Sequence, residues 1–254
     1  MRIALTRAVS PEIARCELTH LDREPIDLAR AAEQHAAYEH ALWELGCEVR
    51  RVRPAPELPD AVFVEDAAVV LDEIAIITRP GAESRRPETA AVADALREYR
   101  PIRAIEAPGT LDGGDVLRIG RTLWVGASSR TNADGIAQLR ELLRPFGYRV
   151  EGVAVEGALH LKTAATLVAP DLLLVNPAWL PATALDGMAR VAVDPAEPFG
   201  ANALLVGTRA LYPAAFPRTL ERLQRHGAAV LTVDASELAK AEGGVTCCCI
   251  VFEP

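Results

Sequence analysis

Four stretches of the chain repeat apolar residues at the spacing of a helix that buries one face. They fall within residues 38–45, 92–99, 136–143 and 217–223. Apolar residues at positions i, i+3, i+4 and i+7 lie on one side of a helix. Each stretch therefore predicts a helix packed against a sheet.

Between these helices, short apolar segments occur in pairs that are joined by a few turn-forming residues, as in β-hairpins. Hairpins that recur at intervals of roughly 40–50 residues suggest radial or solenoid repetition. The sequence therefore predicts an α/β chain of similar units. No linker or low-complexity tract divides it, so we expect one domain over residues 1–254. The paired segments are 61–70 with 74–79, 115–119 with 122–125, 165–168 with 172–175, and 203–206 with 210–212.

A final strand is predicted over residues 243–252, where a glycine pair precedes Thr246, Cys247 and an apolar run. Glycine lets the backbone bend sharply and approach a ligand closely. Three of the five cysteines stand here, and a thiol at the mouth of a sheet can act as a nucleophile. We therefore expect a base, and a group that orients it, elsewhere in the chain.

Composition limits the function classes. Half of the 254 residues are hydrophobic, and the net charge is −8. A substantial core is therefore expected, while nucleic acid and anionic membrane are disfavoured as partners. No segment approaches the roughly 18 unbroken apolar residues of a membrane helix. The start of the chain does not resemble a signal peptide, and the cysteines do not form a disulfide framework. These features predict a cytoplasmic protein.

His160 is the strongest candidate for the base. It opens a predicted strand over 159–163, where an imidazole could reach a thiol on a neighbouring strand. The residues alone leave its role open between catalysis and structure. His35, His40 and His226 are interpreted as solvated or helix-capping side chains.

Carboxylates cluster first at Glu65 and Asp66, shortly after Asp60. Adjacent acids within an apolar strand are costly unless a cation neutralises them. Two interpretations stay open, namely a cationic ligand or an ion pair with Arg79 or Arg85.

A second acidic cluster is Asp112-Gly113-Gly114-Asp115. Two glycines between two acids predict a tight turn that holds both carboxylates close together. One carboxylate could bind a ligand while the other orients a histidine. An ordinary Asp-Gly turn is the alternative interpretation.

Arg85, Arg86 and Arg130 precede predicted helices, in loops beside strand ends. Arginine binds carboxylate through two parallel hydrogen bonds, so it is a natural anchor for an amino-acid substrate. Surface solvation is the alternative, and we favour it for Arg86. A zinc site made by His160, Cys247 and Cys249 is a further, less favoured alternative.

Seven segments also follow one another in a distinctive order. They are Leu58–Asp60, Val62–Asp66, Ile77–Ala82 with Ser84–Arg86, Thr110–Leu117, Arg130–Asn132, Leu159–Lys162 and Gly243–Cys247. Together they make nearly the whole chain resemble the dimethylarginine dimethylaminohydrolase family of the guanidino-modifying superfamily. The resemblance implies a five-bladed α/β propeller of ββαβ-like units with pseudo-fivefold symmetry and a central site. Periodicity alone does not give the number five.

The resemblance also implies roles for single residues. Cys247 matches the nucleophile, His160 the general acid/base, and Asp112 an acid beside that histidine. Some members carry glutamate in place of Asp112, so the shorter aspartate has less reach. The implied substrate-binding residues are Glu65 and Asp66 for the guanidinium group, Arg85 and Arg130 for the carboxylate, and Asp60 with the backbone around Leu18 and Ala241 for the α-amino end. Ala241 is smaller than the aliphatic residue of relatives.

The implied activity is hydrolysis of Nω,Nω-dimethyl-L-arginine, or of the monomethyl form, to L-citrulline and the amine. The reaction passes through a covalent S-alkylthiouronium on cysteine and requires no cofactor and no metal. The expected partner is thus a small methylated arginine, and neither nucleic acid nor a membrane is expected to bind. Assembly of the protein as a homodimer is compatible with this activity. The alternatives are an arginine deiminase-like enzyme of the same superfamily and a non-catalytic thiol protein that binds metal or senses redox state.

Overall fold

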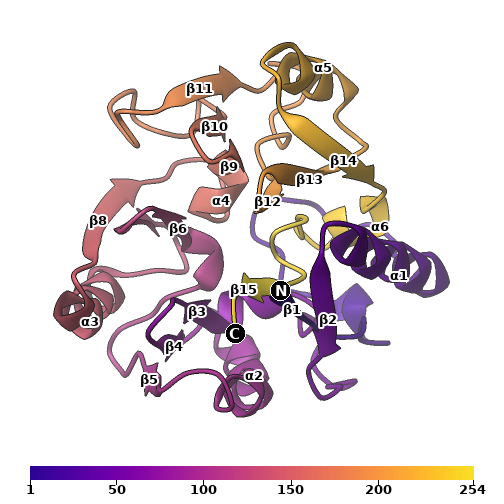
Figure 1. Ribbon diagram of the computed structural model, residues 1–254. Helices are drawn as coiled ribbons and strands as arrows, with labels where there is room; N and C mark the ends of the chain where they lie inside the picture. Colours follow the sequence, from indigo (N-terminus) through magenta and orange to yellow (C-terminus); the bar gives the residue numbers. More distant parts are fainter.

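Five three-stranded sheets form a ring in the computed structural model, which describes residues 1–254 (Figure 1). In every sheet the middle strand pairs antiparallel with one neighbour and parallel with the other. This repetition confirms the predicted five-bladed α/β propeller. The sheets are β15 (Ile250–Phe252), β1 (Arg2–Thr6) and β2 (Cys47–Arg51); β3 (Ala68–Val70), β4 (Ala75–Ile77) and β5 (Ile102–Ala104); β6 (Val116–Ile119), β7 (Thr122–Ala127) and β8 (Arg149–Ala154); β9 (Ala165–Ala169), β10 (Leu172–Val175) and β11 (Ala189–Ala192); and β12 (Leu204–Val206), β13 (Arg209–Pro213) and β14 (Ala229–Val233).

The two ends of the chain share one sheet. β15 pairs antiparallel with β1, so that Leu5 lies opposite Ile250 and Ile3 opposite Phe252. The termini therefore lie close together near the middle of the ring (Figure 1). This pairing also places the segment that precedes β15, which carries Cys247, at the centre.

Four helices connect the middle strand of a sheet to its parallel third strand, a connection that needs a crossover. They are α1 (Leu28–Glu44), α2 (Thr89–Leu96), α3 (Ala133–Leu143) and α5 (Pro217–Arg225), and they lie at the outside of the ring (Figure 1). All four predicted helices are confirmed. Their apolar stripes pack inward; in α3, for example, Leu139 and Leu143 are fully buried.

Short helical turns complete the fold. They are α4 (Leu161–Ala164), α6 (Ser236–Ala239) and five 3₁₀ turns at Ile13–Arg15, Val64–Ala67, Glu83–Glu88, Gly113–Asp115 and Arg144–Phe146. No helix combines the length and apolar character needed to cross a membrane.

The predicted strands differ from the structure where the chain turns toward the centre. The segment 61–70 is a strand only at Ala68–Val70, and 243–252 only at Ile250–Phe252. Residues 159–163 form no strand, because α4 begins at Leu161. A strand would alternate its side chains between two faces. Turns instead gather acids, a histidine and a thiol in one place.

Candidate active site

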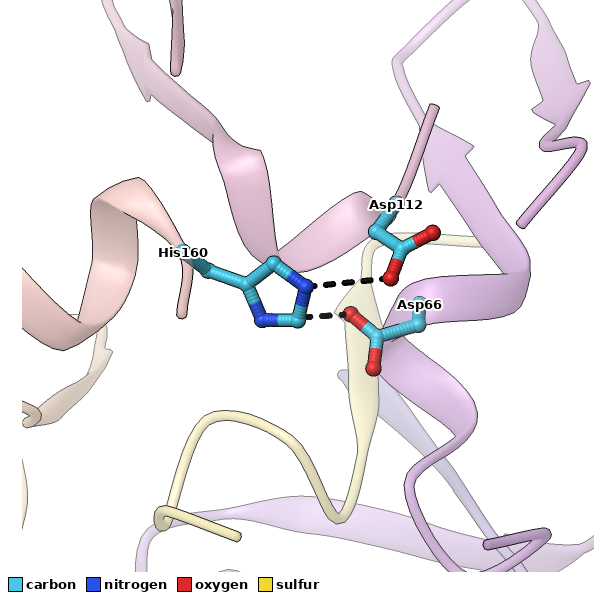
Figure 2. Close-up of side chains that lie close together, drawn as sticks. All are labelled: Asp66, Asp112 and His160. Atoms are coloured by element: carbon cyan, nitrogen blue, oxygen red, sulfur yellow. Dashed lines mark hydrogen bonds and ion pairs between the residues drawn. The ribbon is translucent and has the colours of Figure 1, made fainter. Parts of the chain in front are cut away.

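His160 lies at the start of α4, where it is almost completely buried between two carboxylates. Its Nε2 lies 3.0 Å from Oδ2 of Asp112, and its Nδ1 lies 4.0 Å from Oδ1 of Asp66. Figure 2 shows both carboxyl groups directed at the imidazole ring. The shorter aspartate at position 112 therefore does reach the histidine.

This arrangement keeps His160 protonated at neutral pH. Burial alone would lower the pKa of the imidazole, but the negative charge of Asp66 and the hydrogen bond to Asp112 outweigh it and raise the pKa to about 9. For Asp66, burial acts to raise the pKa, yet His160 and Arg85 hold it below its usual range. The cluster is therefore an imidazolium held by carboxylates and ready to donate a proton.

The glycines between Asp112 and Asp115 are explained by close packing. A Cβ on Gly114 would lie 2.7 Å from Nδ1 of His160, and one on Gly113 would lie 1.9 Å from the carbonyl oxygen of Glu65. Only residues without a side chain let the backbone approach this closely. The motif thus brings its backbone against both the acid pair and the histidine.

Asp115 makes no hydrogen bond to the imidazole and instead binds two side-chain hydroxyls and one backbone N–H. Its carboxylate accepts hydrogen bonds from Ser128 Oγ, Thr131 Oγ1 and the N–H of Leu161. Burial raises the pKa of Asp115 to about 6 against these contacts. Of the two acids in the motif, Asp112 is therefore the one that contacts His160.

Arg85 forms an ion pair with Asp66, which is one of the two interpretations that the sequence allows for the Glu65-Asp66 cluster. Its guanidinium donates to Asp66 at 2.6 Å and to both oxygens of Glu88 at 2.9 and 3.1 Å. All these side chains are buried. Arg79 instead donates to the carbonyl of Gly109. Arg85 therefore neutralises Asp66, and whether it also anchors a substrate carboxylate stays a prediction.

Glu65 points away from its neighbour Asp66. One carboxylate oxygen accepts from Lys162 Nζ at 2.6 Å and the other from Thr246 Oγ1 at 2.7 Å. Protein donors thus occupy both oxygens. The predicted contact of Glu65 with a guanidinium group stays untested, and the structure gives this residue the different task of bracing Thr246 beside Cys247.

Cys247 sits in a tight turn. Its N–H donates to the carbonyl of Gly244, its Sγ accepts from the N–H of Gly244 at 3.3 Å, and its carbonyl accepts from the N–H of Glu65. Burial, with the negative charges of Glu65 and Asp66, raises the pKa of the thiol to about 12. The thiol is thus neutral until a cation enters its surroundings.

The other four cysteines are all fully buried, and only Cys247 retains partial exposure. Cys248 and Cys249 belong to the apolar core that also contains Tyr38 of α1. The zinc trio considered above does not form, because the only cluster of three such ligand groups is Asp66, Asp112 and His160.

A narrow cavity of about 20 Å³ joins these groups. Cys247, His160, Asp66, Asp60, Arg85, Arg130 and Ala241 line it. Arg130 is buried, and its Nη1 has no hydrogen-bond partner and lies 3.9 Å from Asp112 Oδ2. Because a buried donor normally finds a partner, this free N–H is available to an anionic ligand group.

The segment around Leu18 is held over this cavity. Asp60 accepts from the N–H of Glu17, and Arg130 donates to Thr19 Oγ1. Glu242 accepts from the N–H groups of Thr19, His20 and Leu21 at 2.5–3.1 Å. Leu18 itself is half-buried and Ala241 buried, and neither of their carbonyls accepts a hydrogen bond from the protein.

A second cavity, of about 410 Å³, opens at the centre of the ring. Residues of all five innermost strands, β3, β6, β9, β12 and β15, line it. Glu65, Lys162 and Thr246 face this larger cavity, whereas Asp66, His160 and Cys247 face the narrow one. The Glu65–Lys162 ion pair therefore lies in the wall of the wide cavity and not in that of the narrow one.

Sequence reasoning missed several residues that hold the site. Glu242, Asn202, Thr246 and Lys162 received no specific role, although their hydrogen bonds support the loops that carry Leu18, Cys247 and His160. Their partners are mostly distant in sequence. No local pattern could therefore have indicated them.

Comparisons with known proteins agree with the resemblance. A sequence model described as eukaryotic N,N dimethylarginine dimethylhydrolase matches residues 17–185. The N(G),N(G)-dimethylarginine dimethylaminohydrolase of Streptomyces coelicolor is 45% identical over 246 residues, which cover 96% of this chain and 94% of that protein. The protein of the same name from Pseudomonas aeruginosa is 37% identical, with 89% and 90% covered.

Solved structures match over almost the whole chain. A cysteine-to-serine mutant of the Pseudomonas aeruginosa enzyme complexed with citrulline has a TM-score of 0.93 at 35% identity, with 98% of each chain covered. A dimethylarginine dimethylaminohydrolase adduct with S-methyl-L-thiocitrulline also reaches 0.93, at 34% identity, with 99% and 100% covered. The N-terminal domain of a cyanobacterial arginine dihydrolase shares the fold at 20% identity and a TM-score of 0.84. This chain belongs to the dimethylarginine dimethylaminohydrolase family.

Proposed function

We propose that this protein hydrolyses Nω,Nω-dimethyl-L-arginine, and the monomethyl form, to L-citrulline and dimethylamine or methylamine. It would thus be a hydrolase of C–N bonds in linear amidines. The observation that carries the proposal is the narrow cavity, where a partly exposed thiol meets an imidazolium and a carboxylate. These are the groups that a covalent attack on a buried cation requires.

Binding begins with charge pairing. Asp66 lies in the narrow cavity with Cys247, and although its oxygens already accept from Arg85 and from the N–H of Gly114, each keeps a further lone pair with which to hold the guanidinium group. Arg130, which also lines the cavity, offers its free N–H to the α-carboxylate. The carbonyls of Leu18 and Ala241, together with Asp60, are acceptors for the α-amino group, and only the backbone of Ala241 would be used, so its small side chain is tolerated.

The narrow cavity alone is too small for the substrate, since about 20 Å³ holds little more than one water molecule. Residues 17–21 border it through hydrogen bonds to Asp60, Arg130 and Glu242. A neighbouring cavity of about 210 Å³ shares Cys247, Leu159 and Glu242 with it. We therefore expect an arginine-sized molecule either to extend into that neighbouring cavity or to displace this segment.

The substrate assists in forming its own nucleophile. The thiol of Cys247 is neutral before substrate binds, since burial and the negative charges of Glu65 and Asp66 raise its pKa. A bound guanidinium cation reverses that effect and lowers the thiol pKa, so the thiol proton leaves to solvent.

In the first half-reaction the thiolate of Cys247 attacks the central guanidinium carbon and forms a C–S bond. The C–N bond to dimethylamine then breaks, and its electron pair takes the proton of the His160 imidazolium. This leaves a cationic S-alkylthiouronium on Cys247 and a neutral imidazole. Asp112 holds the ring in place throughout.

In the second half-reaction neutral His160 removes a proton from water, and the oxygen attacks the thiouronium carbon. The C–S bond breaks and returns its electron pair to the sulfur, while the oxygen loses its remaining proton to solvent and becomes the ureido carbonyl of citrulline. The imidazolium and the thiolate are thereby regenerated. These steps use side chains and water alone.

We also propose that residues 1–254 act as one catalytic domain with a small-molecule partner. Location in the cytoplasm and assembly as a homodimer are expectations from the sequence. Size-exclusion chromatography with light scattering would test the homodimer.

The test is a parallel citrulline assay on asymmetric dimethylarginine, monomethylarginine, arginine and agmatine, with the released amine identified by mass spectrometry. We expect citrulline and dimethylamine from the first substrate, less citrulline from arginine, and no ureido product from agmatine, which lacks the carboxylate and would give carbamoylputrescine rather than citrulline. Preferred turnover of arginine with release of ammonia would identify a deiminase instead. Citrulline from none of the substrates would contradict the proposal.

A further inference from the structure

Asn202 is a buried side chain that lies between the segment carrying Cys247 and the segment carrying His160. We propose that it is a positioning residue, which fixes the turn of the nucleophile relative to the acid/base for the reaction proposed above. Nothing in the sequence pattern marks it, since it stands just before β12 and far from both segments along the chain.

Asn202 binds the Cys247 turn at two points. Its Oδ1 accepts from the N–H of Thr246 at 3.1 Å, and its Nδ2 donates to Thr246 Oγ1 at 3.0 Å. Thr246 immediately precedes the nucleophile. The amide therefore fixes both the backbone and the side chain of the residue before Cys247.

The second N–H of the same amide binds the other segment. Nδ2 also donates to the carbonyl oxygen of Lys162 at 3.0 Å, two residues after His160. The amide group has two N–H donors and an acceptor oxygen, and each is used in these contacts. Only an amide of this length supplies donors to both segments and an acceptor to the turn.

Gly244 supports the same conclusion from the opposite side. A Cβ on Gly244 would lie 2.3 Å from Oδ1 of Asn202. The glycine therefore lets the amide pack against the turn, and the N–H of this glycine also donates to the sulfur of Cys247. A shift of the turn away from Asn202 would weaken that contact and raise the thiol pKa further.

The matched control is Asn176, which is equally buried but lies in the fourth blade. Its Nδ2 donates to the carbonyl of Pro198, and its Oδ1 accepts from the N–H of Ala178. Both asparagines thus support loops through a buried amide. Only the side chain of Asn202 contacts the Cys247 and His160 segments, whereas Asn176 reaches α4 through its backbone N–H alone, which Asn176→Ala keeps.

The experiment compares Asn202→Ala and the nearly isosteric Asn202→Asp with Asn176→Ala. All three should lower the melting temperature. The Asn202 variants should also lose about 100-fold in kcat on asymmetric dimethylarginine with little change in KM, because small displacements of reacting groups carry costs of that size. Asn176→Ala should keep kcat within about twofold, as expected of a substitution that misplaces no reacting group.

A second pair of variants separates positioning from folding. Thr246→Val removes the hydroxyl that accepts from Asn202, donates to Glu65 and lies 3.9 Å from the Cys247 sulfur, whereas Thr246→Ser keeps that hydroxyl; Asn202→Asp, which leaves the Thr246 hydroxyl in place, is therefore the decisive variant of the set. The rate of Cys247 alkylation by iodoacetamide, followed by peptide mass mapping, should fall in Asn202→Asp and Thr246→Val and recover in Thr246→Ser.

The alkylation readout needs no substrate, so it remains informative if no citrulline is formed and the proposed function fails. Wild-type alkylation rates in Asn202→Asp and Thr246→Val would overturn the positioning role. So would equal losses of kcat in Asn202→Ala and Asn176→Ala.

Discussion

Two regions meet at the centre of the ring, and adjacent residues of the chain divide between them. Asp66, His160 and Cys247 line the narrow cavity, while Glu65, Lys162 and Thr246 line the wide one. The first group keeps its polar atoms near the space that a substrate would fill. The members of the second group bind one another, since Lys162 and Thr246 both donate hydrogen bonds to Glu65. We therefore expect neighbours within one motif to have different roles, with the first group contacting the substrate and the second group supporting the first.

The largest expected difference between the two regions separates His160 from Lys162. His160→Ala should lower kcat by about 10²–10⁴-fold, the usual contribution of general acid–base catalysis. Lys162→Met should lower kcat much less but lower the melting temperature more, because Glu65 would stay buried without its partner. Citrulline kinetics and calorimetry on both variants test this. Similar losses of kcat in the two variants would contradict the proposed difference between the narrow-cavity and wide-cavity residues.

The two adjacent acids give the next contrast. Asp66→Asn should reduce kcat/KM by about 10- to 100-fold, since a hydrogen bond to a charged group contributes ~1.5–3 kcal/mol. Glu65→Gln should reduce it less, because the amide can still accept from Thr246. A larger kinetic loss in Glu65→Gln than in Asp66→Asn would show that Glu65 contacts the substrate directly.

The two predicted carboxylate anchors should also differ. Arg130→Ala should raise KM about tenfold through loss of one charge-assisted contact. Arg85→Ala should lower stability by about 3–5 kcal/mol, because Asp66 and Glu88 lose their buried counterion. Denaturant unfolding alongside KM measurements distinguishes the two. A stable Arg85→Ala protein with only a raised KM would reassign Arg85 as an anchor.

The smallest expected effect is a displaced pH profile. Burial lowers the pKa of His160, but Asp66 and Asp112 raise it to about 9, so the imidazolium is lost as pH rises through that value. Asp112→Asn should therefore move the alkaline limb of kcat/KM to lower pH. The same raised pKa adds stability that is complete below the unfolded value of about 6.5 and disappears as pH rises through about 9.

Melting temperatures measured across this pH range complete that test. The wild type should lose stability more steeply than Asp112→Asn between neutral pH and pH 10. Identical pH dependence of rate and stability in the two proteins would mean that Asp112 does not set the protonation of His160.

Local pattern was sufficient for the outer parts of the fold. The helices α1, α2, α3 and α5 were predicted because an apolar stripe at helical spacing is a property of a few neighbouring residues. The turn around Cys247 was predicted as a strand because its shape depends on distant groups. Its carbonyl accepts from Glu65, and its preceding residue binds Asn202.

Within the site, too, residues whose contacts are distant in sequence could not be predicted. The resemblance indicated Cys247, His160 and Asp112, and the structure brings the latter two to 3.0 Å. The direction of Glu65 could not be predicted, since it depends on Lys162, which lies 97 residues along the chain. Glu242 was equally hidden, because its partners are backbone N–H groups more than 220 residues away.

The most direct test of the account is to identify the covalent intermediate. Wild-type protein is mixed with asymmetric dimethylarginine, quenched in acid within milliseconds to seconds, and digested for mass mapping of all five cysteines. We predict a single adduct, the substrate minus dimethylamine, on Cys247, and its accumulation in His160→Ala. Citrulline formation with no adduct at any time, or with the adduct on another residue, would contradict the proposed mechanism.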